Sequence, residues 1–305
     1  MILSKLLFMD KLIQGTAAGG TIRFMAAITT DITTEAFRRH QTSPTVSAAL
    51  GRVLTGTLLL GASLKEFDRL TVKIECDGAV GGIIAEATPN GNVRGYVKNP
   101  EAELPSKADG KLNVGGIIGN GTFYVIRESG YEIGLHREPY VGSVPIISGE
   151  VAEDFAYYLA KSEQIPSAVI LGVLAQNREP FIAASGGVMI QMLPDANEHI
   201  ATMIEDTIRH APHITSVINN GATPKELVKL ALGEIDFEVL EEREIEFACN
   251  CSFERAVSLI GSLGRQEVEA MLEEDKGAKM TCGFCNELYT LDENDLREML
   301  QKLNG

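Results

Sequence analysis

Two tight cysteine pairs near the C-terminus constrain the fold of this chain more than any other feature. One residue separates Cys249 from Cys251, two separate Cys282 from Cys285, and residues 252–281 join the pairs. Each pair can present two thiolates from one turn, and the intervening chain can fold back to complete a tetrahedral site. Thiolates favour Zn²⁺ or an iron–sulfur cluster over harder ions. The spacing therefore predicts a four-cysteine zinc site, with an iron–sulfur cluster, disulfides or unliganded thiols as alternatives.

Charge narrows the functions that such a site can serve. The chain has a formal net charge of −15, and residues 233–305 contain 18 Asp and Glu against seven Lys and Arg. A zinc module that binds nucleic acid needs clustered basic side chains to contact phosphates. We therefore expect no nucleic-acid partner, although a nucleic-acid-binding zinc module is kept as the second hypothesis. Residues 234–246 hold seven acids and a single arginine, a composition typical of a solvated face or a linker.

Cysteine usage and hydropathy indicate the compartment. The number of cysteines, five, is odd, and no apolar run approaches the roughly 20 residues that a membrane span requires. Residues 1–8 are too short and too poorly organised for a signal peptide. We expect a cytoplasmic protein without membrane contact, because paired cysteines in a reducing compartment are more often metal ligands or redox sensors than structural disulfides. Cys76, in an alternating apolar run, is interpreted as a small buried residue.

The pattern of the chain predicts an α+β fold in three regions. At 305 residues with 45% hydrophobic content, the chain can form more than one domain. Residues 1–194 are expected to form an N-terminal β-sheet domain with packed helices, with residues 1–8 as an extension of it. Residues 195–232 are expected to form a short helical linker. Residues 233–305 are expected to form a small, redox-sensing four-cysteine zinc module.

Individual elements follow from periodicity and turn residues. Ser148 is the expected N-cap of one helix in the N-terminal domain, and Thr223, Pro224 and Glu226 form a capping box that starts the last linker helix. The linker helices carry apolar stripes that are expected to face a core, with a protein-binding surface as the alternative. Further helices are expected at 43–65, 253–263, 266–272 and after Asp292, strands at 122–127, 140–147, 168–175 and 183–193, and a hairpin that joins 82–87 to 93–97.

The module that carries the cysteines has few large apolar residues, so its folding is expected to depend on zinc. A core of this size rarely supplies more than about 3–5 kcal/mol, whereas structural zinc contributes about 10–16 kcal/mol in small peptides. Oxidation of the thiolate ligands would remove the metal. Cys282 and Cys285 can close a disulfide readily, and Cys249 and Cys251 would form a more strained ring. The chemistry permits a redox switch without requiring one.

Enzymatic functions lack support in the sequence. A thiol–disulfide oxidoreductase would place its Cys-x-x-Cys motif near the start of a βαβ unit, whereas Cys282 and Cys285 lie near the end of a small helical module. A hydrolase or transferase would need a nucleophile–base signature, which we do not find. The chain also lacks a Gly-x-x-x-x-Gly-Lys-Ser/Thr loop for a nucleotide triphosphate. We expect the protein not to be an enzyme.

Several longer motifs carry a family resemblance. Besides the cysteine pattern, the chain contains Val-Arg-Gly-Tyr-Val at 93–97, Ser-Glu-Gln-Ile-Pro at 162–166, Ser-Gly-Gly at 185–187 with Gln-Met-Leu-Pro at 191–194, and Cys-Ser-Phe-Glu-Arg at 251–255. Together these motifs resemble the redox-regulated heat-shock holdase family, the 33 kDa chaperonins. The resemblance extends from Met9 to about Leu303.

The resemblance implies a redox-regulated, ATP-independent chaperone. In the reduced, inactive form, Cys249, Cys251, Cys282 and Cys285 would hold one zinc ion per chain. Under oxidative and heat stress, Cys249 would pair with Cys251 and Cys282 with Cys285, and zinc would leave. The C-terminal module would then unfold, the linker would be destabilised, and apolar surface would bind unfolding client proteins and prevent their aggregation. A homodimer of the oxidised form is also implied.

Overall fold

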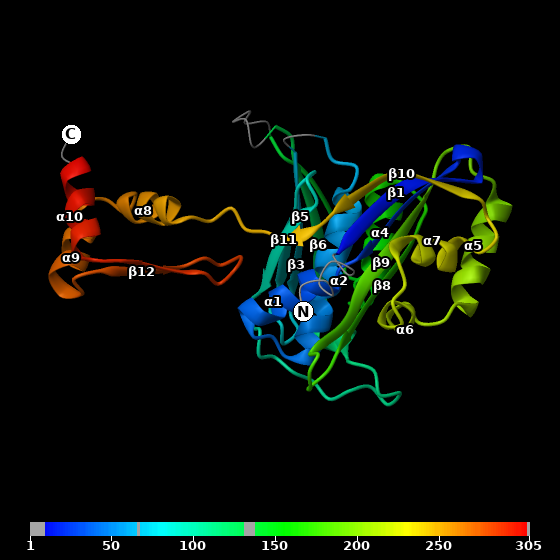
Figure 1. Cartoon of the computed structure of the whole chain (residues 1–305), viewed down its shortest axis with the longest axis horizontal. Coiled ribbons are helices and arrows are strands. Elements are labelled where there is room, and N and C mark those ends of the chain that lie inside the picture. Colours follow the sequence, from blue (N-terminus) through cyan, green and yellow to red (C-terminus); the bar gives the residue numbers. More distant parts are fainter. Residues whose placement is uncertain (1–9, 66–67, 131–137, 304–305) are drawn as a thin grey trace, which may run out of the picture. The chain divides into compact units, whose positions relative to one another are not determined.

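The computed structural model describes residues 10–65, 68–130 and 138–303 (Figure 1). The chain divides into two compact units, Met1–Ala248 and Cys249–Gly305. Both contain helices and strands, so the predicted α+β class is confirmed. The expected extension, residues 1–8, lies outside the described residues.

The larger unit is built on two sheets. Sheet A has the antiparallel order β10-β1-β2-β9-β8, and sheet B has the order β11-β5-β4-β3-β6-β7, with a parallel pairing between β11 and β5. The strands of sheet A are β1 (Lys11–Ala17), β2 (Ile22–Ile28), β8 (Ser167–Ala175), β9 (Ile182–Met192) and β10 (Phe237–Glu244). Those of sheet B are β3 (Arg69–Cys76), β4 (Ile83–Ala87), β5 (Asn92–Val97), β6 (Gly121–Glu128), β7 (Tyr140–Pro145) and β11 (Glu246–Phe247). The predicted strands and the predicted β4–β5 hairpin are confirmed.

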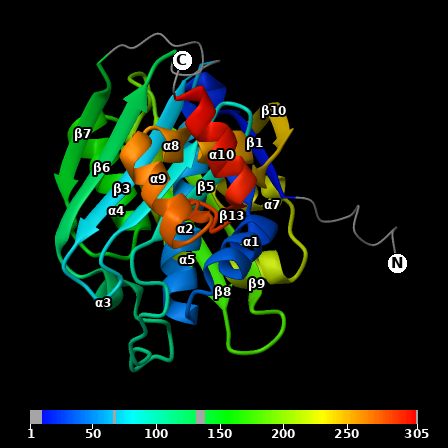
Figure 2. The same cartoon turned by 90° about the vertical axis from the view of Figure 1, so that its left-hand side faces the viewer.

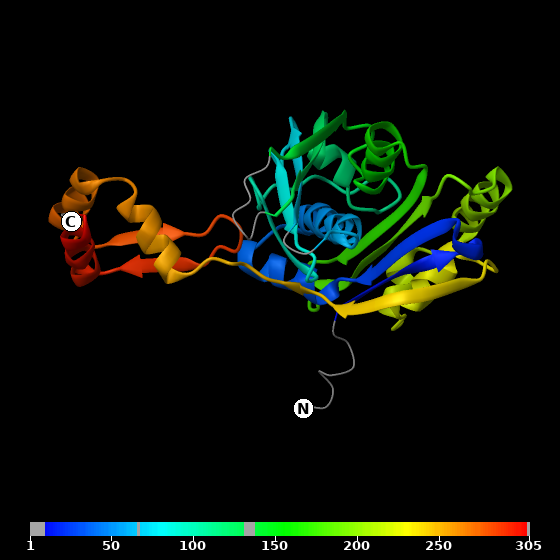
Figure 3. The ribbon, with the colours of Figure 1, turned by 90° about the horizontal axis from the view of Figure 1, so that it is seen from above.

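Helix α2 (Pro44–Gly61) lies between the two sheets and confirms the helix predicted over 43–65 (Figure 3). It contacts β8 and β9 on one side and β4 and β5 on the other, and nearly all of its residues are buried. The hydroxyl of Ser43 accepts a hydrogen bond from the Val46 amide at 3.2 Å and caps the helix. A Cβ atom at Gly51 would lie 2.6 Å from Thr33, so small residues allow the helix to approach its neighbours.

Shorter helices surround this layer, and the start of one of them differs from the prediction. Besides α1 (Thr30–His40) and α3 (Val114–Ile118), the unit contains α4 (Ala152–Tyr158), which continues into the π-helical turn η3 (Leu159–Glu163). Ser148 was the expected N-cap of α4, and this prediction is wrong. The carboxylate of Asp154 instead accepts hydrogen bonds from the amides of Ile147, Ser148 and Val151 at 2.8, 3.2 and 3.0 Å. These bonds hold the preceding chain in a turn, so the helix begins at Ala152.

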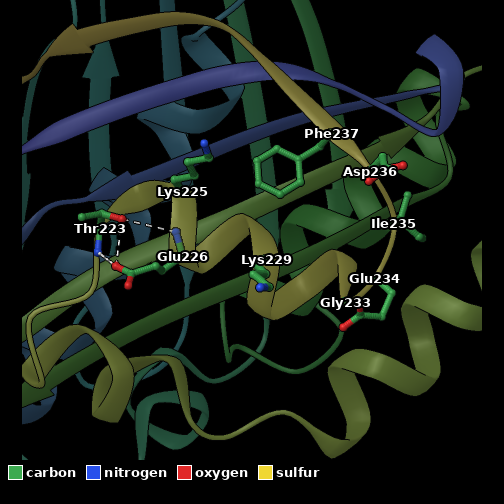
Figure 4. Close-up of a pocket in the computed structure, with 9 residues that line it drawn as sticks. All are labelled: Thr223, Lys225, Glu226, Lys229, Gly233, Glu234, Ile235, Asp236 and Phe237. Atoms are coloured by element: carbon green, nitrogen blue, oxygen red, sulfur yellow. Dashed lines mark hydrogen bonds between the residues drawn. The ribbon is translucent and has the colours of Figure 1, made fainter.

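The predicted linker forms helices that cover the face of sheet A opposite α2 (Figure 1). These are α5 (Glu198–His210), α6 (Ile214–Asn219) and α7 (Pro224–Leu232). Their apolar side chains form one core with the sheet, so the core-facing interpretation is confirmed. The capping box of α7 is also present: the Thr223 amide donates to the Glu226 carboxylate at 2.6 Å, and the Glu226 amide donates to the Thr223 hydroxyl at 3.4 Å (Figure 4).

Residues 233–248 differ most from the sequence interpretation. The acidic stretch 234–246 is interpreted as a solvated face or linker. Its acids are exposed, as a solvated face requires, but the stretch contains a strand, β10, which pairs with β1 from Lys11–Glu244 to Ala17–Phe237. The ring of Phe237 packs edge-on against Phe24 at 5.5 Å, whereas the acids occupy exposed positions of this edge strand. The compact unit that carries the cysteines therefore begins at Cys249, and this structural boundary differs from the predicted one at residue 233.

The smaller unit contains the three predicted helices and a hairpin (Figure 2). Its elements are α8 (Phe253–Gly261), α9 (Arg265–Glu274), β12 (Ala278–Thr281), β13 (Leu288–Leu291) and α10 (Glu293–Lys302). Asp292 caps α10 as predicted, since its carboxylate accepts from the Asn294 and Asp295 amides at 2.8 and 3.0 Å. The core consists of a few side chains: Ile260, Val268, Leu291, Leu296 and Met299. Within the described part of the whole chain, no helix is both long and apolar enough to cross a bilayer.

Candidate metal centre

The β12–β13 hairpin positions the second cysteine pair. The strands end at the Thr281–Leu288 pair, and the turn beyond it contains Cys282 and Cys285. The Cys282 amide donates to the carbonyl of Glu287 at 2.9 Å, and the Asn286 amide donates to the carbonyl of Cys282 at 2.8 Å. Asn286 has a φ of 58°, a left-handed conformation that asparagine tolerates better than most residues. Backbone hydrogen bonds thus close the turn around both thiols.

The start of α8 positions the first cysteine pair. Cys249 and Cys251 lie in the irregular segment directly before this helix. The Ser252 hydroxyl accepts from the Arg255 amide at 3.2 Å, and the Arg255 guanidinium reaches back to donate to the carbonyl of Asn250 at 2.7 Å. The helix cap therefore fixes the chain on both sides of Cys251.

The four predicted ligands meet in one place. All four sulfur atoms lie within 4.8 Å of one another. The Sγ atoms of Cys249 and Cys282 are 3.7 Å apart, and those of Cys251 and Cys285 are 3.3 Å apart. Tetrahedral coordination with Zn–S bonds of about 2.3 Å separates the sulfurs by about 3.8 Å. The observed spacing is close to this value, so the four thiolates can hold one metal ion.

The surroundings of the sulfurs favour a cation at their centre. The Cys285 side chain is 2% exposed, and burial raises the pKa of its thiol despite a backbone hydrogen bond at Glu287 that lowers it. Burial also raises the pKa of the Cys251 thiol. Thiolates at such a site need a compensating positive charge, which a bound divalent cation supplies.

Tyr289 is a member of the site that sequence reasoning missed. Its hydroxyl donates a hydrogen bond to Cys251 Sγ at 3.1 Å, and this bond raises the pKa of the tyrosine. Groups that hydrogen-bond a ligand atom orient it and tune its charge. Its position four residues after Cys285 was the one hint in the sequence that Tyr289 lies near the site. The contact itself depends on the β12–β13 hairpin, which directs the ring toward the other cysteine pair.

Cys76 is separate from this cluster among the described residues. It lies at the end of β3 in the larger unit, where it is partly buried against the core. Burial raises the pKa of its thiol. The environment agrees with the interpretation of Cys76 as a packing residue.

Comparison with known proteins gives the family. A family model described as Hsp33 protein matches residues 10–292, a range that includes all four clustered cysteines. The chain belongs to the Hsp33 family. The resemblance seen in the sequence motifs is therefore confirmed. Hsp33 proteins are chaperones rather than enzymes, so the chain is a heat-shock chaperone whose partners are client proteins.

Individual Hsp33 relatives cover nearly the whole chain. The protein named 33 kDa chaperonin of Desulforamulus reducens is 42% identical over 294 residues, which cover 96% of this chain and 98% of the relative. The 33 kDa chaperonin of Enterococcus faecalis is 42% identical over 95% of this chain and 96% of its own length. The crystal structure of the 33 kDa chaperonin (heat shock protein 33 homolog) from Thermotoga maritima matches with a TM-score of 0.89 and 34% identity. That match covers 98% of this chain and all of the other.

Proposed function

We propose that this chaperone is a redox-regulated, ATP-independent holdase whose reduced form is kept inactive by one zinc ion per chain. The observation that carries the proposal is the meeting of four cysteine sulfurs within 4.8 Å at the edge of a very small core. In the proposed reduced state, Cys249, Cys251, Cys282 and Cys285 are the ligands. Oxidation removes the ligands, and with them the main stabilising interaction of the small unit.

Zinc suits the sulfur spacing better than an iron–sulfur cluster. A cluster places several iron and sulfide atoms between its cysteine ligands. Sulfur pairs 3.3 and 3.7 Å apart leave space for a single ion. Zinc also prefers a closed tetrahedral set of thiolates in structural sites, and it is redox-silent, so an oxidant would react with the sulfurs rather than with the metal.

The metal is proposed to determine whether the small unit is folded. Besides Ala256 and Cys285, its buried apolar residues are the five of the core named above, whereas Leu259, Leu263 and Leu288 are each more than half exposed. A core of this kind contributes about 3–5 kcal/mol, and zinc binding contributes about 10–16 kcal/mol in small peptides. Loss of the metal therefore leaves too little free energy to offset the conformational entropy of the chain.

The proposed oxidation joins Cys249 to Cys251 and Cys282 to Cys285. In each pair the two thiolates would give two electrons to one hydrogen peroxide, which takes up two protons from the solvent and leaves as two water molecules, and a sulfur–sulfur bond forms. Once both pairs are oxidised, no thiolate would remain to hold the single zinc ion. Close sulfur contacts in the structure also run between the pairs, from Cys249 to Cys282 at 3.7 Å and from Cys251 to Cys285 at 3.3 Å. Peptide mapping of the oxidised protein distinguishes the proposed pairing from this cross-pairing.

Unfolding of the small unit is proposed to expose a client-binding surface on sheet A. The helices of residues 195–232 cover apolar side chains of the sheet, including the fully buried Phe24 and Val188, with their own Leu227 and Val228. Along the chain, the small unit is connected to these helices through β10, an edge strand that pairs with β1, and through Gly233 at the end of α7 (Figure 4). Displacement of β10 would loosen α7 and uncover the apolar face.

The oligomeric state, the partners and the compartment are proposed on the same grounds. Two exposed apolar faces can pair, which supports a homodimer of the oxidised form. The net charge of −15 argues against a nucleic-acid partner, and we propose a reducing cytoplasm without membrane contact as the place of action. A salt-dependent mobility-shift assay with DNA and RNA tests the alternative of a nucleic-acid-binding module.

An aggregation assay tests the central proposal. The reduced, zinc-loaded protein and a peroxide-treated sample are each added to a client protein that unfolds thermally, and released zinc is measured with a chromogenic chelator. We expect light scattering to be suppressed by the oxidised sample only, in proportion to the zinc released. Equal suppression by both samples, or suppression without zinc release, would contradict the proposed switch.

A further inference from the structure

A cavity of about 340 Å³ lies where the two sheets of the larger unit approach each other, remote in the sequence from the cysteine cluster. Its lining comes from β2 and β9 of sheet A, from β6 of sheet B, and from residues next to α2 and in η3. Five charged side chains line it: Arg23, Lys65, Asp68, Arg127 and Glu163. Three cations thus face two acids in this cavity, although the net charge of the chain is strongly negative.

The two acids of the cavity already have partners. Glu163 receives a hydrogen bond from the Tyr158 hydroxyl at 2.5 Å and pairs with Arg127 at 3.1 Å. The Asp68 carboxylate accepts from the Gly130 amide at 3.1 Å. Neither acid forms an ion pair with the remaining two cations.

Among the described residues, Arg23 and Lys65 are the cations of this cavity that form no ion pair. The Nε and Nη2 atoms of Arg23 both donate to the amide oxygen of Gln191, at 2.9 and 2.5 Å, and among the described residues Arg23 forms no ion pair. Lys65 is exposed at the mouth of the cavity and likewise has no acidic partner within the part of the chain that the structure describes. Burial lowers the pKa of Arg23, and the positive charge of Arg127 lowers it further. A bound anion would therefore stabilise the charged form of the Arg23 guanidinium.

We propose that this cavity binds a small oxyanion, of the phosphate or carboxylate class, through Arg23 and Lys65, with Arg127 adding a third positive charge. Gln191 accepts from Nε and Nη2 of Arg23, but the guanidinium has five N–H groups, and those left on Nη1 and Nη2 match the oxygens of either group. The volume is at the low end of the range for ligand pockets, about 300–1,000 Å³, which suits a small anion or head group rather than a large cofactor.

The occupied site would connect the two sheets. Arg23 belongs to β2 of sheet A, and Arg127 belongs to β6 of sheet B. An anion in the cavity would be attracted to both positive charges, which otherwise repel each other. Because such a ligand binds the folded chain and not the unfolded one, it would raise the unfolding temperature of the larger unit. This effect is independent of the zinc centre and of the proposed redox switch.

Thermal unfolding of the full-length, reduced, zinc-loaded protein tests the proposal. Inorganic phosphate is added up to about 20 mM at constant ionic strength, and acetate is used in a parallel series. For the wild type we expect Tm to rise by about 2–4 °C for each tenfold increase in anion concentration above Kd. A response to phosphate alone identifies the phosphate class, a response to acetate alone identifies the carboxylate class, and no response to either overturns the proposal.

Matched variants separate the site from general salt effects. Arg23→Gln should abolish the response or weaken it at least tenfold, whereas Arg178→Gln, which removes an exposed arginine outside the cavity, should keep it. Lys65→Gln changes an exposed side chain and provides a second test if Arg23→Gln does not fold. Line broadening of the phosphate signal in ³¹P NMR gives a readout that does not depend on stability. An equal response of Arg23→Gln or Lys65→Gln and the wild type would refute the assignment.

Discussion

The buried carboxylate of Asp10 should make the stability of the larger unit depend on pH near neutrality. Asp10 precedes β1 and is 3% exposed; one carboxylate oxygen accepts from the Ile32 amide in the first turn of α1 at 2.8 Å. The other oxygen, Oδ1, has no hydrogen-bond partner among the described residues. Burial raises the pKa of this carboxyl from its ordinary value of 3.8 to about 7, although backbone hydrogen bonds from α1 lower it and the nearby Asp31 raises it.

The pH dependence of stability follows from the pKa of Asp10 in the unfolded chain, 3.8, and in the folded chain, about 7. The folded state keeps the proton of Asp10 up to about pH 7, whereas the unfolded chain loses it near pH 3.8, so the folded state binds more protons between these values. Stability therefore falls as the pH rises through this window and levels off above the folded pKa. Between about pH 5.5 and about pH 8 the group should remove about 2 kcal/mol from the free energy of unfolding.

Asp10→Asn removes this titration while keeping the shape of the side chain and an acceptor for Ile32. Urea unfolding, followed by far-UV circular dichroism in zinc-loaded protein under reducing conditions, would be compared for both proteins at about pH 5.5 and about pH 8. The other titrating groups, including the cysteines, are common to both proteins and cancel in the comparison. We expect the variant to gain about 2 kcal/mol relative to the wild type over this interval. A difference between the two proteins that does not change with pH would refute the reasoning.

Three further results are expected from the proposed function. Cys282→Ser should lose most of the bound zinc and Cys76→Ser should keep it, because the structure places Cys76 outside the sulfur cluster; equal zinc content in both variants, measured by elemental analysis, would exclude the four-sulfur site. Calorimetric titration should show no micromolar binding of ATP, and client protection should not require it, since the chain has no phosphate-binding loop. After peroxide treatment, hydrogen exchange should accelerate throughout residues 249–303 and to a lesser degree in β10 and residues 195–232, while the other strands of the two sheets stay protected; a protected cysteine unit in a sample that suppresses aggregation would argue against the unfolding mechanism.

The features that sequence reasoning predicted correctly depend on neighbours along the chain. The cysteine pairs and the Thr223–Glu226 capping box each lie within a few residues, so their spacing alone determines what they can form. β10 was not predicted as a strand because its many acids outweigh the alternating apolar residues Phe237 and Val239 in the sequence pattern. The strand is stabilised by its pairing with β1, which is far away in the sequence. Tyr289 and the Arg23 cavity depend on contacts between segments far apart in the sequence, and no local pattern indicates which strands or turns will meet.

The acids of β10 also affect how this chaperone behaves beside its clients. An open sheet edge offers unpaired backbone groups to any extended chain, and unfolding proteins supply such chains in quantity. Along β10 the glutamates at 238, 241, 242 and 244 are exposed, and Arg243 is directed into the molecule by its hydrogen bond to the carbonyl of Pro89 at 2.5 Å. Negative charge along an edge disfavours strand addition by another chain. While β10 stays in place, its charges therefore disfavour the growth of intermolecular sheets from this edge.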